Sequence, residues 1–281
     1  MIRFFILAGY VELMMYLQSS GKLDQYINVH YRYLAILSMI LAFVLALVQL
    51  IQWVRNDHGE HDHEHAHHEG HHHHTPKKGW QKILGYGVIA VPLLVGLLFP
   101  TVSLDTTIVE AKGFQFPVSK ESVGDPEMQT QYLKPDTSMY FNKDDYKTQM
   151  DEAMSHYQGD TLEITDSNYL EVMELIYNYP SEFMGKKIRY TGFIYKAQQE
   201  ARTDLFAFRF GIIHCVADSG VFGLLIQPPK SMDFNDNDWV QLEGTLAMNY
   251  YEPFKRQIPV VQVTNVTPVA APANQYVYRS F

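Results

Sequence analysis

The sequence predicts a protein of two parts, an α-helical membrane part with three transmembrane helices and a soluble α+β domain built around a five-stranded β-barrel. Two observations predict this division: two uncharged stretches of 22 residues lie before residue 105, and five short alternating strands follow residue 185. Charge divides the chain in the same way, because residues 1–100 carry 7 basic and 7 acidic side chains and the rest carry 15 and 24. We expect a membrane part over 1–104, a partly helical polar linker over 105–165 and a barrel domain over 166–281.

Each uncharged stretch is long enough to cross a membrane as a helix. One lies between Arg32 and Arg55 and the other between Lys82 and Asp105, and a transmembrane helix needs about 20 apolar residues. Aromatic residues stand near the ends of both stretches, as is typical of membrane interfaces. Two helices packed on a soluble core are the alternative, but such helices usually keep a polar face towards water, which neither stretch has. We therefore expect both stretches to contact membrane lipid.

The first hydrophobic segment covers 18 residues between Arg3 and Lys22 and is interrupted by Glu12. A signal peptide is one interpretation, since a basic start and a short apolar run are typical of one. We favour a retained first span, because Glu12 falls inside the apolar run and the sequence that follows is a poor cleavage site. An intramembrane carboxyl should face a protein partner or a water-filled path. A protonated Glu12 packed against the second helix is the alternative.

The distribution of basic residues predicts the orientation of a multi-pass protein in the cell membrane. With three spans, the N-terminus and the loop after Arg55 share one side, which carries five basic residues, whereas the other short loop carries Lys22 and Arg32 only. The N-terminus and the loop before Lys82 are therefore expected in the cytoplasm, and the chain after about residue 104 outside the cell.

A histidine-rich insert at 57–74 is the strongest chemical signal in the chain. Imidazole and carboxylate groups bind zinc and also nickel or copper. The tract has no apolar residues for a core, so we expect several exchangeable sites of modest affinity and no single closed geometry. A solvated polar linker without specific binding is the alternative, and a purification tag is disfavoured because the tract is internal and mixed with acids. The candidate ligands are His58, His61, His63, His65, His67, His68, His71, His72, His73 and His74, interleaved with Asp57, Glu60, Asp62, Glu64 and Glu69.

The rest of the chain predicts two helices and then a barrel. A helix is expected near 142–157, and a second one follows Ser167 as N-cap and stops before Pro180. Strands are expected at 186–197, 205–214, 221–227, 238–251 and 257–269. Gly192 and Gly244 fall in the middle of two strands, where glycine permits the sharp bend of a small closed barrel. Five strands with such glycines predict an OB-like barrel.

Composition excludes several classes of function. The acidic second half disfavours nucleic acid, which needs a basic groove. A single cysteine, Cys215, excludes an intrachain disulfide and a multi-cysteine metal site. His214, Cys215 and Asp218 fall within five residues and are a second, weaker candidate for a metal site. The alternative is that Cys215 and Val216 alternate into the core while the other two shape the turn. We find no nucleophile–base set and expect no enzymatic activity.

Several motifs resemble a known family. The opening RFFILAGY, the His-rich loop, and above all GKKIRYTGFIY, FRFGIIHCVADSGVFGLLI and DWVQLEGTL are similar to the YcgQ-like permease subunits, the DUF1980-type membrane proteins of Gram-positive bacteria. The resemblance implies an auxiliary subunit with an extracytoplasmic domain that works beside a multi-span permease. The family pattern has two cysteines shortly before the Ala-Asp of the motif FRFGIIHCVADSGVFGLLI. This chain departs from that pattern, because His214 stands at the first of the two positions and Cys215 at the second. An autonomous membrane-anchored protein that binds metal or an envelope component is the other hypothesis.

Overall fold

The computed structural model describes residues 2–57, 79–99, 106, 109, 143–198, 203–228 and 233–280. Their contacts divide the chain into two compact units, Met1–Val102 and Ser103–Phe281. The histidine-rich tract lies outside the described residues, and so do most residues of the expected linker.

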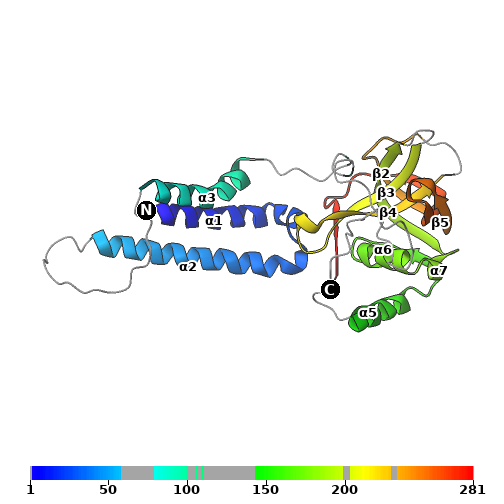
Figure 1. Cartoon of the computed structure of the whole chain (residues 1–281), viewed down its shortest axis with the longest axis horizontal. Helices are drawn as coiled ribbons and strands as arrows, with labels where there is room; N and C mark the ends of the chain where they lie inside the picture. Colours follow the sequence, from blue (N-terminus) through cyan, green and yellow to red (C-terminus); the bar gives the residue numbers. More distant parts are fainter. Residues whose placement is uncertain are drawn as a thin grey trace. The chain divides into compact units, whose positions relative to one another are not determined.

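The described part of the first unit contains the α-helices α1 (Ile2–Ser19), α2 (Arg32–Asp57) and α3 (Gly79–Leu98) (Figure 1). All three occur where the sequence predicts helices. Among the described residues, the stretch Val29–Arg55 is long and apolar enough to cross a membrane, and the apolar part of α3, Ile83–Leu98, is shorter. The first unit is therefore a helical part with one clear candidate for a membrane span.

Helix α1 packs between α2 and α3 (Figure 1). Its contact with α3 is close, because a Cβ atom on Gly9 would lie 2.6 Å from Leu93 Cδ2 and one on Gly96 would lie 2.9 Å from Leu13 Cδ2. The contacts advance in the same direction along both helices, so α1 and α3 run parallel. A tyrosine fixes the pair, since Tyr10 donates a hydrogen bond from its hydroxyl to the carbonyl of Ile89 at 2.8 Å.

The connection between α1 and α2 is built from two short 3₁₀ helices, η1 (Lys22–Gln25) and η2 (Val29–Tyr31). Arg32, at the start of α2, donates from Nε to Asp24 Oδ1 at 2.9 Å. Asn28 is fully buried and accepts a hydrogen bond from the backbone N–H of His30 at 3.1 Å. This ordered connection lets α2 return antiparallel to α1 (Figure 1).

The second unit contains a mixed five-stranded β-barrel, as the sequence predicts. Among the described residues the barrel closes in the order β2–β3–β4–β6–β5–β2, in which β4 and β6 are parallel and the other pairs antiparallel. Its strands are β2 (Lys187–Gln198), β3 (Thr203–Ile212), β4 (Gly220–Gln227), β5 (Trp239–Tyr251) and β6 (Arg256–Pro268). Each lies within two residues of its predicted limits.

The two predicted glycines bring strands close together. A Cβ atom on Gly192 would lie 2.8 Å from the carbonyl oxygen of Phe208, and one on Gly244 would lie 2.5 Å from that of Gln262. Gly244 also stands at a shift in the pairing of β5 with β6, next to Glu243. A β-bulge of this kind bends a strand and increases its twist. Gly244 therefore stands at a bend, as predicted, and Gly192 allows the close approach of β2 to β3.

Among the described residues, the barrel is accompanied by α5 (Lys143–His156), α6 (Tyr169–Asn178) and α7 (Pro180–Phe183). Helix α6 presents Leu170, Met173 and Ile176 to the barrel core, where each is at most 1% exposed. The predicted N-cap is wrong by one residue, because Asn168 and not Ser167 precedes the helix. Pro180 ends α6 as expected, and it begins α7 because proline is favoured at the first position of a helix.

Two short strands extend the barrel sheet without having been expected. Strand β1 (Thr161–Glu163) pairs in parallel with the start of β2, and β7 (Tyr276–Tyr278) pairs in parallel with the end of β3. Thr106 and Val109 also belong to this unit: the backbone N–H of Thr106 donates to Asn237 Oδ1 at 3.2 Å, and Val109 is buried in the core. Residues at both ends of the expected linker therefore take part in the barrel unit.

Candidate functional site

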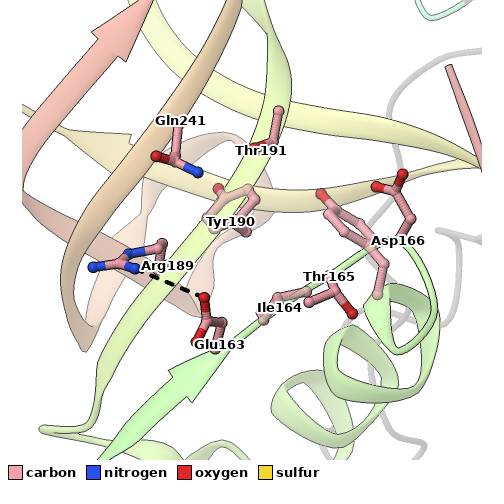
Figure 2. A pocket seen from close by; sticks show the side chains of 9 residues that line it. Glu163, Ile164, Thr165, Asp166, Arg189, Tyr190, Thr191 and Gln241 are labelled. Carbon is pink, nitrogen blue, oxygen red and sulfur yellow. Dashed lines mark ion pairs between the residues drawn. The ribbon is translucent and has the colours of Figure 1, made fainter. Parts of the chain in front are cut away.

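A pocket of about 270 Å³ opens on the barrel unit beside β1 and the loop that leads into α6 (Figure 2). Strand β2 supplies Arg189 to it, β1 supplies Glu163, and β5 supplies Gln241, so three neighbouring strands form its charged side. The loop after β1 adds Asp166. The lining residues are Glu163, Ile164, Thr165, Asp166, Tyr169, Arg189, Tyr190, Thr191 and Gln241.

Arg189 lies between two glutamates, of which Glu163 lines the pocket and Glu243 does not. Its Nε is 2.8 Å from Glu243 Oε1. Its Nη1 is 3.7 Å from Glu163 Oε1, the ion pair that Figure 2 shows as a dashed line. The first pair follows from strand register, because Arg189 and Glu243 are direct partners across β2 and β5. All three side chains are at least 36% exposed, and exposed ion pairs contribute about 0–1 kcal/mol. A polar ligand can therefore exchange partners with them at little cost.

A buried arginine, Arg209, lies behind the pocket and holds its lining residue Asp166 in place. This side chain is 1% exposed, and its Nη1 donates to Asp166 Oδ1 at 2.8 Å. Its other donors reach the backbone carbonyls of Gln275 at 3.3 Å and Asn274 at 3.2 Å, just before β7. The guanidinium also lies over the Trp239 ring, 5.1 Å from its centroid. Arg209 thus joins the loop before α6, strand β3 and the C-terminal segment.

Three buried tyrosines stand behind the pocket and along α6. Burial raises the pKa values of Tyr169, Tyr177 and Tyr190 well above their usual range. Tyr169 donates its hydroxyl proton to the carbonyl of Phe222 at 3.1 Å, and Tyr177 donates to that of Gly223 at 2.7 Å. Because the hydroxyls of Tyr169 and Tyr177 stay protonated and donate to backbone carbonyls of β4, these two side chains hold α6 to β4.

The structure brings His214 and Asp218 together in the turn between β3 and β4. Asp218 Oδ2 lies 2.7 Å from His214 Nδ1, and Asp218 Oδ1 accepts hydrogen bonds from the backbone N–H groups of His214 at 3.1 Å and Cys215 at 2.9 Å. In return, the Cys215 sulfur accepts from the backbone N–H of Asp218, which completes a capping box around a 3₁₀ turn, η4 (Val216–Asp218). This geometry gives Asp218 a structural task in the turn.

Within the ranges that the structure describes, no group of three His, Cys, Asp or Glu side chains is arranged to hold a metal ion. The ten histidines of the tract lie beyond those ranges. Glu12 is described, and its side chain is exposed on α1. Its neighbour Leu13 is buried against α3, so the two residues face different sides of the helix. The carboxylate of Glu12 does not pack into the seam between the helices.

The sequence analysis missed the pocket, although one signal for part of it is present. The strand FAFRFGII contains one charge, Arg209, in an otherwise apolar run, and a buried charge requires partners. Nothing local in the sequence points to Asp166 or to the carbonyls before β7 as those partners. Arg189 and Glu243 look like ordinary outward residues of two alternating strands until their register places them side by side.

These features define a class of protein: a helical unit with a candidate membrane span, followed by a mixed barrel domain that carries a charged pocket. Residues 2–115 match the DUF1980 N-terminal domain and residues 140–279 match the DUF1980 C-terminal domain. The chain belongs to the DUF1980 family, which confirms the resemblance noted from the motifs.

Two relatives align with this chain over the full length of both proteins. A Streptococcus mutans protein named "Putative two-component membrane permease complex subunit" is 46% identical over 286 residues. The UPF0703 protein YcgQ of Bacillus subtilis is 42% identical over 287 residues. Both alignments cover the whole of this chain and the whole of each relative.

Proposed function

We propose that this protein is the auxiliary membrane subunit of a two-component permease and acts beside a second, multi-span subunit. The observation that carries the proposal is the full-length relative at 46% identity whose name describes a subunit of such a complex. The candidate site agrees with a role in binding, since Arg189 and Asp166 of its lining are held in ion pairs and the hydroxyl of Tyr169 is used in a backbone hydrogen bond.

Three transmembrane helices with the N-terminus in the cytoplasm are the proposed topology. The parallel packing of α1 and α3 supports it, because the first and third of three successive spans must run in the same direction. Close approach at glycines is typical of helix contacts in membranes, and α1 and α3 meet at Gly9 and Gly96. Large apolar side chains stay exposed along α2 and α3, where lipid would cover them.

The barrel domain is proposed to lie outside the cell and to be OB-like. Its strand order, with strands one to three consecutive and strand five inserted between three and four, supports an OB-type barrel. Such a fold does not by itself name a ligand, and the net charge of −9 disfavours nucleic acid.

A metal link is the third part of the proposal. Residues 57–74 offer ten imidazoles and five carboxylates, a donor set that suits zinc or another divalent transition metal. On the proposed topology this tract faces the cytoplasm, where it would concentrate the ion beside the permease. We rank the turn with His214, Cys215 and Asp218 second as a metal site. Its carboxylate is already used, because Asp218 accepts three hydrogen bonds within the turn.

The test is purification of the full chain, tagged at its C-terminus, from its own membranes in mild detergent. We expect one multi-span membrane protein to elute with it at a constant ratio through two further columns, and to be missing from an untagged control. Elution of the chain alone would contradict the permease proposal. It would favour an autonomous membrane-anchored binding protein, for which the charged pocket around Arg189 is the supporting observation.

A further inference from the structure

One face of α1 stays exposed among the described residues of the helical unit. Residues three, four or seven positions apart lie on the same side of a helix, and this spacing joins five exposed residues that we call the open face. Phe5, Met15 and Tyr16 are 63%, 56% and 44% exposed. The open face comprises Phe5, Glu12, Met15, Tyr16 and Ser19.

The other sides of α1 are occupied. Leu13 is buried against Gly96 of α3, and Gly9 receives Leu93, while α2 contacts α1 along its length. The open face is therefore what remains after both neighbouring helices of the unit have packed.

Glu12 lies near the middle of this face and of the 18-residue helix. Neither a hydrogen bond nor an ion pair joins its carboxylate to any residue in the described ranges of the chain. Two described basic side chains near the ends of α1 contact tyrosine hydroxyls and not Glu12: Arg3 donates to the Tyr86 hydroxyl at 2.9 Å, and Lys22 donates to that of Tyr16 at 2.7 Å. If α1 crosses the membrane, Glu12 falls close to the centre of the apolar layer, where a carboxylate directed at lipid is strongly disfavoured.

We propose that the open face of α1 docks against a transmembrane helix of a second, different membrane protein, which places a basic side chain against Glu12. Charge complementarity identifies the occupant, because an ionised carboxylate in a low-dielectric layer is best compensated by a hydrogen-bonded cation. Phe5, Met15 and Tyr16 supply apolar contact above and below the ion pair. The inference rests on the proposed function. It adds that the open face of α1 is the surface that binds the partner, and that the partner places a basic side chain against this face.

The test compares variants in the purification of the full chain, once wild type has identified the partner. Glu12→Leu should lower partner recovery by about tenfold or more, because it leaves the partner's cation buried without a counter-charge. Glu12→Gln keeps the shape and should give an intermediate loss. Leu41→Ala, at a side chain of α2 that is 58% exposed, is the matched control and should recover the partner fully. Equal recovery with Glu12→Leu overturns the inference and leaves the proposed function intact.

A second measurement locates the contact directly. A photoreactive diazirine amino acid at position 15, on the open face, should cross-link to the identified partner, whereas the same group at position 13 should not, because Leu13 faces α3. A cross-link between two copies of this chain at position 15 would show that a second copy covers the face and would overturn the inference. Failure of wild type to recover any partner would instead count against the proposed function.

Discussion

At the scale of single residues, Gly223 of β4 leaves no room for a side chain against β3. A Cβ atom there would lie 1.9 Å from the carbonyl oxygen of Ala207. The same residue exchanges two hydrogen bonds with Tyr177, whose hydroxyl donates to its carbonyl at 2.7 Å and accepts from its N–H at 2.8 Å. Gly223 therefore joins the barrel wall and α6 through its backbone alone.

Gly223→Ala should destabilise the barrel unit by about 1–3 kcal/mol or more, since the added methyl group forces two strands apart. Hydrogen exchange of the full chain in detergent measures this as faster exchange of β3 and β4 amides. Gly159→Ala is the matched control, because a Cβ atom there would be 3.9 Å from its nearest neighbour, the carbonyl oxygen of Thr161. Unchanged protection in Gly223→Ala would show that the barrel tolerates a wider spacing.

Single residues also mark the limit of what the sequence reveals about the site. The glycines at 192 and 244 are recognisable because a glycine inside an alternating strand is itself a signal. The ion pair of Arg209 with Asp166 joins residues 43 positions apart, and only the closed barrel brings them together. Asp218 is a candidate metal ligand by residue type. Its hydrogen bonds to the backbone of the turn depend on the backbone dihedral angles there, which cannot be predicted from the sequence.

At the scale of elements, α5 is attached to α6 by a partly buried tyrosine. Tyr157, just after α5, donates its hydroxyl proton to Glu171 of α6 at 2.8 Å. Burial, together with the hydrogen bond and charge of Glu171, raises the pKa of Tyr157 to about 12. Because the folded-state pKa exceeds the ordinary value of about 10, this group's contribution to stability is complete below about pH 10 and is lost as the pH rises towards 12.

Tyr157→Phe should lower the free energy of unfolding by about 0.5–1.5 kcal/mol below pH 10, the contribution of one hydrogen bond. The difference from wild type should shrink as the pH rises from about 10 to about 12, because wild type loses the same contribution there. Urea unfolding of the full chain at a series of pH values measures it, with Tyr250→Phe as control for a tyrosine that is 58% exposed. A difference that stays constant with pH would contradict the assignment.

The elements themselves are mostly predictable from local pattern. The five barrel strands and α6 have clear periodicity of apolar residues, and the structure confirms them. Strands β1 and β7 are three residues long, too short for alternation to be recognised. They exist because β2 and β3 offer them backbone partners, which is information from elsewhere in the chain.

At the scale of the whole molecule, we expect zinc binding to depend on the histidine-rich tract and the stability of the barrel to be independent of it. Wild type should bind more than one zinc ion per chain and should release zinc between about pH 7 and pH 5.5, as imidazole is protonated. Deleting residues 58–74 should abolish most of this binding. Calorimetry of the full chain measures the stoichiometry, and hydrogen exchange should find the barrel unchanged. Asp218→Ala, with the tract intact, should keep the stoichiometry. Undiminished zinc binding after the deletion would move the site to His214, Cys215 and Asp218.

The central claim is that this chain works as one of two membrane subunits, and the mass of the complex tests it most directly. Native mass spectrometry of the complex released from its own membranes should give a species heavier than the 32.5 kDa chain by the mass of one multi-span membrane protein, in a fixed ratio. Dissociation in the gas phase should return both proteins. A spectrum containing only the single chain or its homo-oligomers would contradict the claim.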